Sequence, residues 1–384
     1  MSNHAGLRIF VLIDALGWCF LQQQEFLSDL LPCRMPLRTV LGFSSGAIPT
    51  ILTGLLPQQH GHWNLFYYDP QHSPFRWLRA VQFLPDRILD HRITRRVVKE
   101  IGRHVLGLGP LFECCVSPRF LPSFNWIEKR DIYERGGIIG ARSIFDRLAD
   151  TGIPCRVYSY RHGTDNHILK QARQDVATES SGFLFIYLSE FDLFLHNNCN
   201  DTNRWKARLE WYACQLGELF RAAVSLNPQT TLTLFSDHGM TPVIRHFDLV
   251  QEIHSLNLRL GRDYLAVYDS TMARFWFFTD RARGHITQCI DGMGCGRILS
   301  DQELQEFGVF FPDRRYGELI FLMHPGWLIA RSDFNGRGWL PEGMHGYDPS
   351  DPYSDAVFLS NREPPIPMHS VADVYQCMHR SVQA

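Results

Sequence analysis

Three short apolar runs constrain the fold of this chain more than any other feature. Residues 7–14 (LRIFVLID), 183–189 (FLFIYLS) and 230–236 (TTLTLFS) are separated by segments with helical spacing. Apolar strands that alternate with helices are typical of a sheet covered on both faces. The sequence therefore predicts an α/β fold, with a mostly parallel central sheet flanked by helices. Two of those helices are expected over 139–150 and 203–225.

Polar residues follow these runs at the points where the strands should end. Asp14 closes the first run, and Asp237 and His238 follow the third. In open α/β sheets, ligands bind at the carboxyl ends of the strands. Two further motifs, SEFDLFLH and GMHGYDP, add another carboxylate and two imidazoles. The candidate metal ligands with a carboxylate or an imidazole are Asp14, Asp192, His196, Asp237, His238 and His345, and the oxygen of Ser44 is a further candidate ligand.

The chemistry of this set favours zinc, with manganese as the second choice, because it offers oxygen and imidazole ligands without thiolate. Six side chains can hold two ions. Two metals about 3.5–4 Å apart can stabilise both the entering and the leaving oxygen of a phosphoryl displacement. The pattern therefore indicates two divalent cations acting on a phosphate ester.

A pair of serines supplies a candidate nucleophile. The segment LGFSSGAIPTILTG places Ser44 and Ser45 just before an expected helix, with Pro49 in its first turn and Gly54 at its end. A hydroxyl there would lie among free backbone N–H groups, which form a natural anion site. The simpler role for either serine is to cap the helix. Beside a metal pair, such a serine needs no histidine base.

Taken in order, these motifs resemble those of the alkaline phosphatase superfamily, specifically its type I phosphodiesterases and nucleotide pyrophosphatases. The resemblance rests on VLIDALGW, FSSGAIPTILTGLLPQQHG, EFDLFLH, SDHGM and MHGYD, which span residues 11–348. It implies an alkaline phosphatase-like core with inserted cap elements. It also divides the ligands into two metal sites: Asp192, His196 and His345 for one, and Asp14, Asp237 and His238 for the other.

The same resemblance favours Ser44 over Ser45 as nucleophile, because the family's nucleophile lies nine residues before the residue matching Thr53. The chain departs from the phosphodiesterase pattern here, since that branch commonly has Thr followed by Pro and Asn. Serine is the nucleophile of the superfamily's phosphomonoesterases and mutases. For contacts with the substrate phosphate, the candidates are Asn64, one residue earlier than the family's Asn, and Arg161, after the strand-like CRVYSY.

Two stretches are interpreted as insertions into the catalytic core. One carries many Pro, Arg and aromatic residues, and the other contains DYLAVYD, ARFWFF and ELIFLM, which predict a small antiparallel sheet. The expected division is core 1–68, cap 69–135, core 136–245, α+β insertion 246–335 and core 336–384.

The first insertion contains a basic segment. Residues 76–104 carry eight Lys or Arg and three Asp or Glu, a net charge of +5. A solvated helix face is the ordinary interpretation of such a run. The alternative is a cap that steers an anionic substrate or holds a nucleotide through Trp77 and Phe83.

The charge of the whole chain, −2, gives no electrostatic argument for nucleic acid or membrane partners. Ten cysteines without a CxxC pair indicate reduced thiols. The N-terminus enters an apolar run by Leu7, which leaves no room for a signal peptide, so a cytoplasmic location is expected. The longest stretch without Asp, Glu, Lys or Arg, 39–68, is interrupted by Pro and His and predicts no membrane span.

The sequence thus predicts a two-zinc phosphoric ester hydrolase of the phosphodiesterase or nucleotide pyrophosphatase type. Ser44 would form a covalent phosphoserine, and the substrate would be a small anionic phosphate ester. A phosphomonoesterase or a phosphotransferase of the same superfamily is the alternative. A sulfatase is disfavoured because no Cys/Ser-x-Pro-x-Arg signature surrounds the serines. A metal-free binding protein is disfavoured by the complete ligand set.

Overall fold

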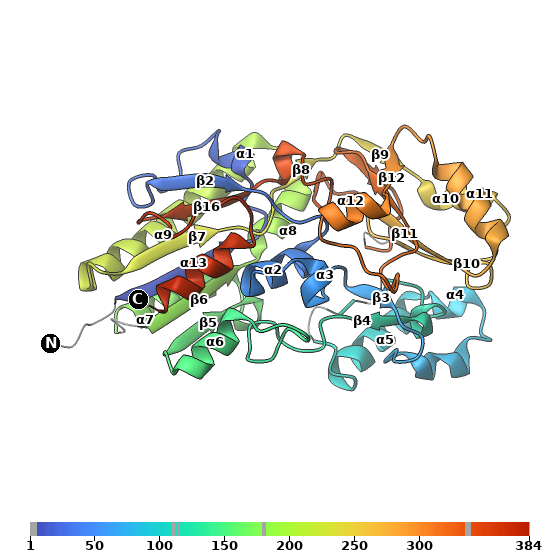
Figure 1. Ribbon diagram of the computed structural model, residues 1–384, viewed down its shortest axis with the longest axis horizontal. Coiled ribbons are helices and arrows are strands. Elements are labelled where there is room, and N and C mark those ends of the chain that lie inside the picture. The colour runs from blue at the N-terminus through green and yellow to red at the C-terminus, as the bar shows by residue number, and fades with distance from the viewer. Residues whose placement is uncertain (1–5, 110–111, 114, 179–181, 335–338, 384) are drawn as a thin grey trace. The chain divides into compact units, whose positions relative to one another are not determined.

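A computed structural model describes residues 6–109, 112–113, 115–178, 182–334 and 339–383 (Figure 1). The chain forms two compact units. Unit 1 comprises 1–61, 133–242 and 342–384, and unit 2 comprises 62–132 and 243–341. The two insertions predicted from the sequence, 69–135 and 246–335, thus fall almost entirely within one unit.

Unit 1 is built on a six-stranded sheet with the strand order β2-β16-β7-β1-β6-β5. The four strands β7, β1, β6 and β5 are parallel, and β16 and β2 add an antiparallel edge. The prediction of a mostly parallel α/β sheet is therefore confirmed. The strands are β1 (Leu7–Ile13), β2 (Cys33–Leu37), β5 (Cys155–Tyr158), β6 (Gly182–Leu188), β7 (Thr231–Phe235) and β16 (Ala356–Ser360), with the short pair β8 (Thr241–Pro242) and β15 (Gly343–Met344).

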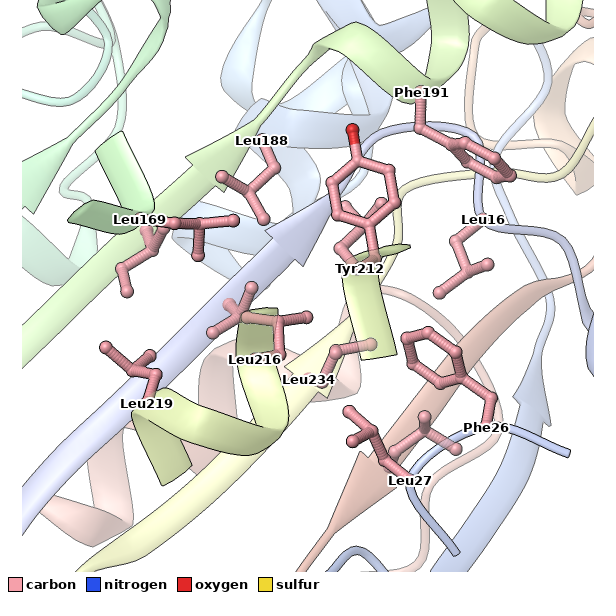
Figure 2. Packing of buried hydrophobic residues seen from close by; sticks show 14 of the residues in the cluster. Leu16, Phe26, Leu27, Leu169, Leu188, Phe191, Tyr212, Leu216, Leu219 and Leu234 are labelled. Atoms are coloured by element: carbon pink, nitrogen blue, oxygen red, sulfur yellow. The ribbon is translucent and has the colours of Figure 1, made fainter. Parts of the chain in front are cut away.

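Helices cover this sheet. The helices are α1 (Trp18–Leu21), α2 (Ser44–Thr53), α3 (Pro57–His60), α6 (Ile144–Thr151), α7 (Asp165–Val176), α8 (Glu190–Asn198), α9 (Thr202–Leu226) and α13 (Asp373–Ser381), with the 3-10 turns η3 (Tyr160–His162) and η4 (Pro352–Ser354). Figure 2 shows Leu169 of α7 and Tyr212, Leu216 and Leu219 of α9 packed with Leu234 of β7. These side chains are buried in one apolar cluster, which packs the helices against the sheet.

Two helix predictions need correction. The helix expected over 139–150 begins only at Ile144, because Gly140 adopts a positive φ of 98° and Ser143 caps the helix by accepting from the amide of Asp146. In α2, Ser44 is the first residue, so Pro49 is the sixth and does not lie in the first turn. Gly54 ends α2 in the left-handed region, as expected.

Unit 2 contains a four-stranded antiparallel sheet with the order β10-β11-β13-β12, which confirms the predicted antiparallel strands. Its remaining pairs are β3 with β4 and β9 with β14. The strands are β3 (Phe66–Tyr68), β4 (Phe124–Trp126), β9 (Arg245–Phe247), β10 (Tyr264–Tyr268), β11 (Met272–Phe277), β12 (Gly296–Ile298), β13 (Leu319–Met323) and β14 (Trp327–Ile329).

The helices of unit 2 are α4 (Asp86–Leu89), α5 (Arg92–His104), α10 (Leu249–Ser255), α11 (Asp280–Ile290) and α12 (Asp301–Glu306), with the 3-10 turns η1 (Arg76–Val81) and η2 (Leu121–Ser123). A fully buried arginine, Arg274, links separate segments of unit 2. Arg274 pairs through Nε with Asp269 Oδ2 at 2.5 Å and donates from Nη1 to the carbonyl oxygens of Phe66 and Tyr316. Among the helices described in both units, none is long and apolar enough to cross a membrane.

Candidate metal centre

The parallel strands of unit 1 bring the predicted ligands to one edge of the sheet. Asp14 directly follows β1, Asp237 follows β7, and α8 begins two residues after β6. The amide of Asp14 donates to the carbonyl of Leu188 at 3.0 Å, which continues the β1–β6 pairing to the end of both strands. Two separate groups of three side chains result, and all six residues belong to unit 1.

The first group consists of Asp14, Asp237 and His238, all buried. His238 Nε2 lies 3.6 Å from Asp14 Oδ1 and 3.2 Å from Asp237 Oδ2. Ser44 Oγ lies 3.0 Å from the same nitrogen. The structure therefore places the candidate nucleophile directly against the first group. Ser44 is partly exposed, whereas Ser45 is buried.

The second group consists of Asp192, His196 and His345. His196 Nε2 lies 3.3 Å from Asp192 Oδ2, and His345 Nε2 lies 3.5 Å from Asp192 Oδ1. The His345 ring also stacks on the His238 ring of the first group, with centroids 3.8 Å apart and planes 16° apart. The two groups are thus direct neighbours.

Backbone carbonyls fix the orientation of two imidazoles. His196 Nδ1 lies 2.8 Å from the oxygen of Gly343, and His238 Nδ1 lies 2.9 Å from that of Gly239. A carbonyl oxygen only accepts, so Nδ1 carries the proton in each ring. In the neutral rings, the Nε2 electron pairs then face the carboxylates of their own groups. This is the arrangement by which proteins present histidine to a metal.

The two groups differ in their electrostatics. Burial, together with the charges of Asp237 and Asp192, raises the pKa of Asp14 well above its ordinary value. Burial also opposes ionisation of Asp192, but His196, His345 and His238 together outweigh it and lower the pKa of that carboxyl. For His345, burial and the neighbouring His238 lower the pKa well below the ordinary value, which keeps the ring neutral and able to bind a metal.

The residues fit divalent cations. Asp14 Oδ1, Asp192 Oδ1 and Asp237 Oδ2 are buried oxygens that accept no hydrogen bond from the described residues. Leaving a buried carboxylate oxygen unpaired is costly. A cation in each group would satisfy these oxygens and relieve the repulsion that raises the pKa of Asp14.

Sequence reasoning missed two supporting residues. The hydroxyl of Tyr187, in β6, donates to Asp14 Oδ2, whereas Oδ1 is the oxygen that lies 3.6 Å from His238 Nε2. Asp165, the first residue of α7, accepts from the amides of Ser189 and Glu190 at 3.1 Å each, at the start of the helix that carries Asp192 and His196. The only signal for Tyr187 was a hydroxyl in an otherwise apolar run.

The predicted substrate contacts lie in different units. Arg161 is exposed on η3 of unit 1. Asn64 belongs to unit 2, where it is buried and its Nδ2 lies 3.7 Å from Met272 Sδ. Contact of either residue with a phosphate stays a prediction. His60 is buried, with Nε2 3.0 Å from Thr50 Oγ1.

Solved structures share this fold. Murine ectonucleotide pyrophosphatase / phosphodiesterase 5, as an inactive threonine-to-alanine variant in complex with AMP, has 16% identity over 98% of this chain and 94% of its own, with a TM-score of 0.67. The human protein has 14% identity over 97% of this chain and 94% of its own, with a TM-score of 0.68. At such identities the likeness establishes the fold. No curated protein sequence matches the chain.

The family is established by a separate comparison. The family model described as type I phosphodiesterase / nucleotide pyrophosphatase matches residues 43–348, which include Ser44 and five of the six predicted ligands. This confirms the resemblance stated from the motifs. The chain therefore belongs to the type I phosphodiesterase / nucleotide pyrophosphatase family and is a hydrolase that acts on phosphoric ester bonds.

Proposed function

We propose that the chain is a two-metal, zinc-dependent phosphodiesterase or nucleotide pyrophosphatase that acts through a covalent phosphoserine at Ser44. The observation that carries this proposal is the position of Ser44 Oγ, 3.0 Å from His238 Nε2, beside two adjacent groups with a complete ligand set. Family membership supports the reaction class.

The two groups would hold one cation each, with Asp14, Asp237 and His238 on one side and the remaining three ligands on the other. Bound divalent cations would lower the pKa of an oxygen beside them and offset negative charge on phosphate oxygens. The donor set of carboxylate oxygens and imidazole nitrogens suits zinc first and manganese second.

Ser44 is better placed than Ser45 to act as nucleophile. It is the first residue of α2 and is partly exposed, so its hydroxyl can meet a substrate. The start of α2 offers backbone N–H groups to phosphate oxygens. In the first step the Ser44 hydroxyl loses its proton, a bond forms between Oγ and phosphorus, and the bond from phosphorus to the leaving oxygen breaks; solvent supplies the proton that the leaving oxygen needs. In the second step water loses a proton and attacks phosphorus, and the Ser44 oxygen leaves and regains a proton.

The favoured substrates are small phosphodiesters or pyrophosphates such as nucleotide conjugates. AMP bound to the murine relative supports a nucleotide moiety. The second candidate is a phosphomonoesterase, which the serine at position 44 favours. We also propose a cytoplasmic location, supported by the free thiols of the nine described cysteines; cell fractionation would test it.

A hydrolysis panel tests this function. The purified enzyme would receive nitrophenyl phosphodiester, phosphomonoester and sulfate substrates, beside the variants Ser44→Ala and Ser45→Ala. We expect the diester to be turned over fastest and Ser44→Ala to lose about 10³-fold or more in kcat, with Ser45→Ala within about tenfold of wild type. Faster monoester turnover would favour the phosphomonoesterase. Full activity in Ser44→Ala with loss in Ser45→Ala would refute the assigned nucleophile.

A further inference from the structure

Exposed apolar side chains gather in one segment of unit 2. Fifteen large hydrophobic residues are exposed among those described, and six of them lie between Trp77 and Val105. Phe83 is 81% exposed, Ile93 61% and Val97 49%. Single exposed hydrophobic residues are common, whereas exposed apolar side chains that form one patch mark an interaction surface.

Helix α5 shows how these side chains are arranged. Arg92 and Arg96 lie one turn apart on its solvent face, and Ile93 and Val97 form an adjacent exposed row. The opposite face is buried, where Val98 lies in the unit's apolar cluster. The helix therefore presents apolar and cationic side chains to the solvent together.

Helix α4 extends this surface. Its residues Arg87 and Ile88 are exposed. The hydroxyl of Thr94 in α5 donates to the carbonyl of Ile88 at 2.6 Å, which ties the two helices together. We call the exposed set formed by the two helices the α4–α5 surface; it consists of Arg87, Ile88, Arg92, Ile93, Arg96 and Val97.

The surface keeps its positive charge because nearby acidic groups are already paired. Asp86 pairs with Arg119 and Asp90 with Arg95 at 2.9 Å, while Glu100 lies 3.2 Å from Nε2 of His104, which offsets its charge only when that ring is protonated.

In contrast, Arg87, Arg92 and Arg96 form no ion pair with any residue in the described ranges, which leaves their charges available to an anionic partner.

We propose that the α4–α5 surface docks on an anionic lipid bilayer. Three arginines would contact headgroup phosphates, while Ile88, Ile93, Val97 and the preceding Phe83 would enter the interface between headgroups and acyl chains. Amphipathic helices at membrane surfaces bind in this layer through buried apolar area and through attraction of Lys and Arg to anionic lipids. A nucleic acid would use the arginines but would leave the aliphatic row in water. This docking is independent of the proposed reaction.

Liposome co-sedimentation of the purified full chain tests the proposal. Vesicles of phosphatidylcholine with about 30% phosphatidylserine would be compared with phosphatidylcholine alone. Each basic residue near such a surface contributes about fivefold in partitioning. We therefore expect the triple variant Arg87→Gln/Arg92→Gln/Arg96→Gln to bind the anionic vesicles about 100-fold less well. The apolar variant Ile93→Ser/Val97→Ser should also lose binding.

A matched variant controls for charge alone. Lys170→Gln/Arg204→Gln/Arg281→Gln removes three basic residues from α7, α9 and α11 and should bind nearly as well as wild type. Thermal unfolding and nitrophenyl ester hydrolysis should be unchanged in all variants. Equal loss in the matched variant, or no binding of wild type to anionic vesicles, would overturn the proposal. The proposal would also be overturned if the wild type formed a dimer that Ile93→Ser/Val97→Ser dissociates without any loss of vesicle binding.

Discussion

The two three-residue groups of the candidate metal centre lie side by side but are built differently. The first contains two carboxylates and one imidazole, and the charge of Asp237 helps to raise the pKa of Asp14. The second contains one carboxylate and two imidazoles, and His196 lowers the pKa of Asp192. The first group therefore depends on a cation to offset its own repulsion, whereas the second is partly neutralised by its own histidine.

Their supports differ as well. In the first group, the Tyr187 hydroxyl holds one oxygen of Asp14 directly. In the second, His196 and Asp192 share one helix, and Asp165 holds the start of that helix through two backbone amides. A tyrosine hydroxyl thus holds a residue of the first group directly, whereas Asp165 acts on the second group through the backbone of α8; in both groups one imidazole is also held by a backbone carbonyl.

Replacement of one carboxylate in each group should give the largest effect. Asp237→Asn and Asp192→Asn should each lower kcat/KM by about 10³-fold or more, because each removes a ligand from one cation site. In chelator, their stabilities should diverge. Asp192→Asn should lose about 1–3 kcal/mol, since it breaks the buried pair with His196, whereas Asp237→Asn relieves repulsion on Asp14 and should lose less.

Urea unfolding in chelator would measure these differences. If Asp237→Asn proved the more destabilised of the two, the contrast between the groups would be wrong.

The pH dependence of the free energy of unfolding should test the support that Asp165 gives to the second group. Burial is the main cause that raises the pKa of Asp165 to about 6, against about 3.9 when unfolded. Its contribution to stability is therefore fully present below about pH 4 and is lost as the pH rises to about 6. Relative to Asp165→Asn, wild type should lose about 3 kcal/mol between pH 4 and 7. A difference between the two unfolding free energies that stays constant with pH would contradict this.

The smallest effect should come from Tyr187→Phe, which removes only the hydroxyl that holds Asp14. Loss of an outer hydrogen bond of this kind weakens metal binding about 10–100-fold. Zinc titration should show this loss at one of two sites, with the other unchanged. Tyr375→Phe, in α13, is the matched control and should bind as wild type does. Equal weakening of both sites would mean that Tyr187 does not distinguish the groups.

Much of the core and of the ligand set could be predicted from the sequence, because each group contains a residue that follows a predicted strand or a residue in a motif, and the motifs occur in the order of the family. Asp14 and Asp237 follow apolar runs directly, and parallel strands bring such ends together. The start of α6 could not be placed in the same way, since the positive φ at Gly140 is a local property that periodicity does not report.

The supporting residues were missed for a different reason. Tyr187 lies in an otherwise apolar strand, where a tyrosine is ordinarily a core residue, and only the parallel pairing of β1 with β6 brings its hydroxyl to Asp14. Asp165 accepts from the amide of Glu190, the first residue of α8, which lies 25 residues further along the chain. No local sequence pattern encodes such a contact. The union of 62–132 and 243–341 in one unit is likewise a long-range property.

The metal content of the purified, zinc-supplemented protein tests the central claim most directly. Elemental analysis after extensive dialysis should find two zinc ions per chain in wild type, with one lost in Asp237→Asn and one in Asp192→Asn, and activity should disappear in chelator. Near-zero zinc in wild type, together with activity and stability that chelator leaves unchanged, would contradict the account.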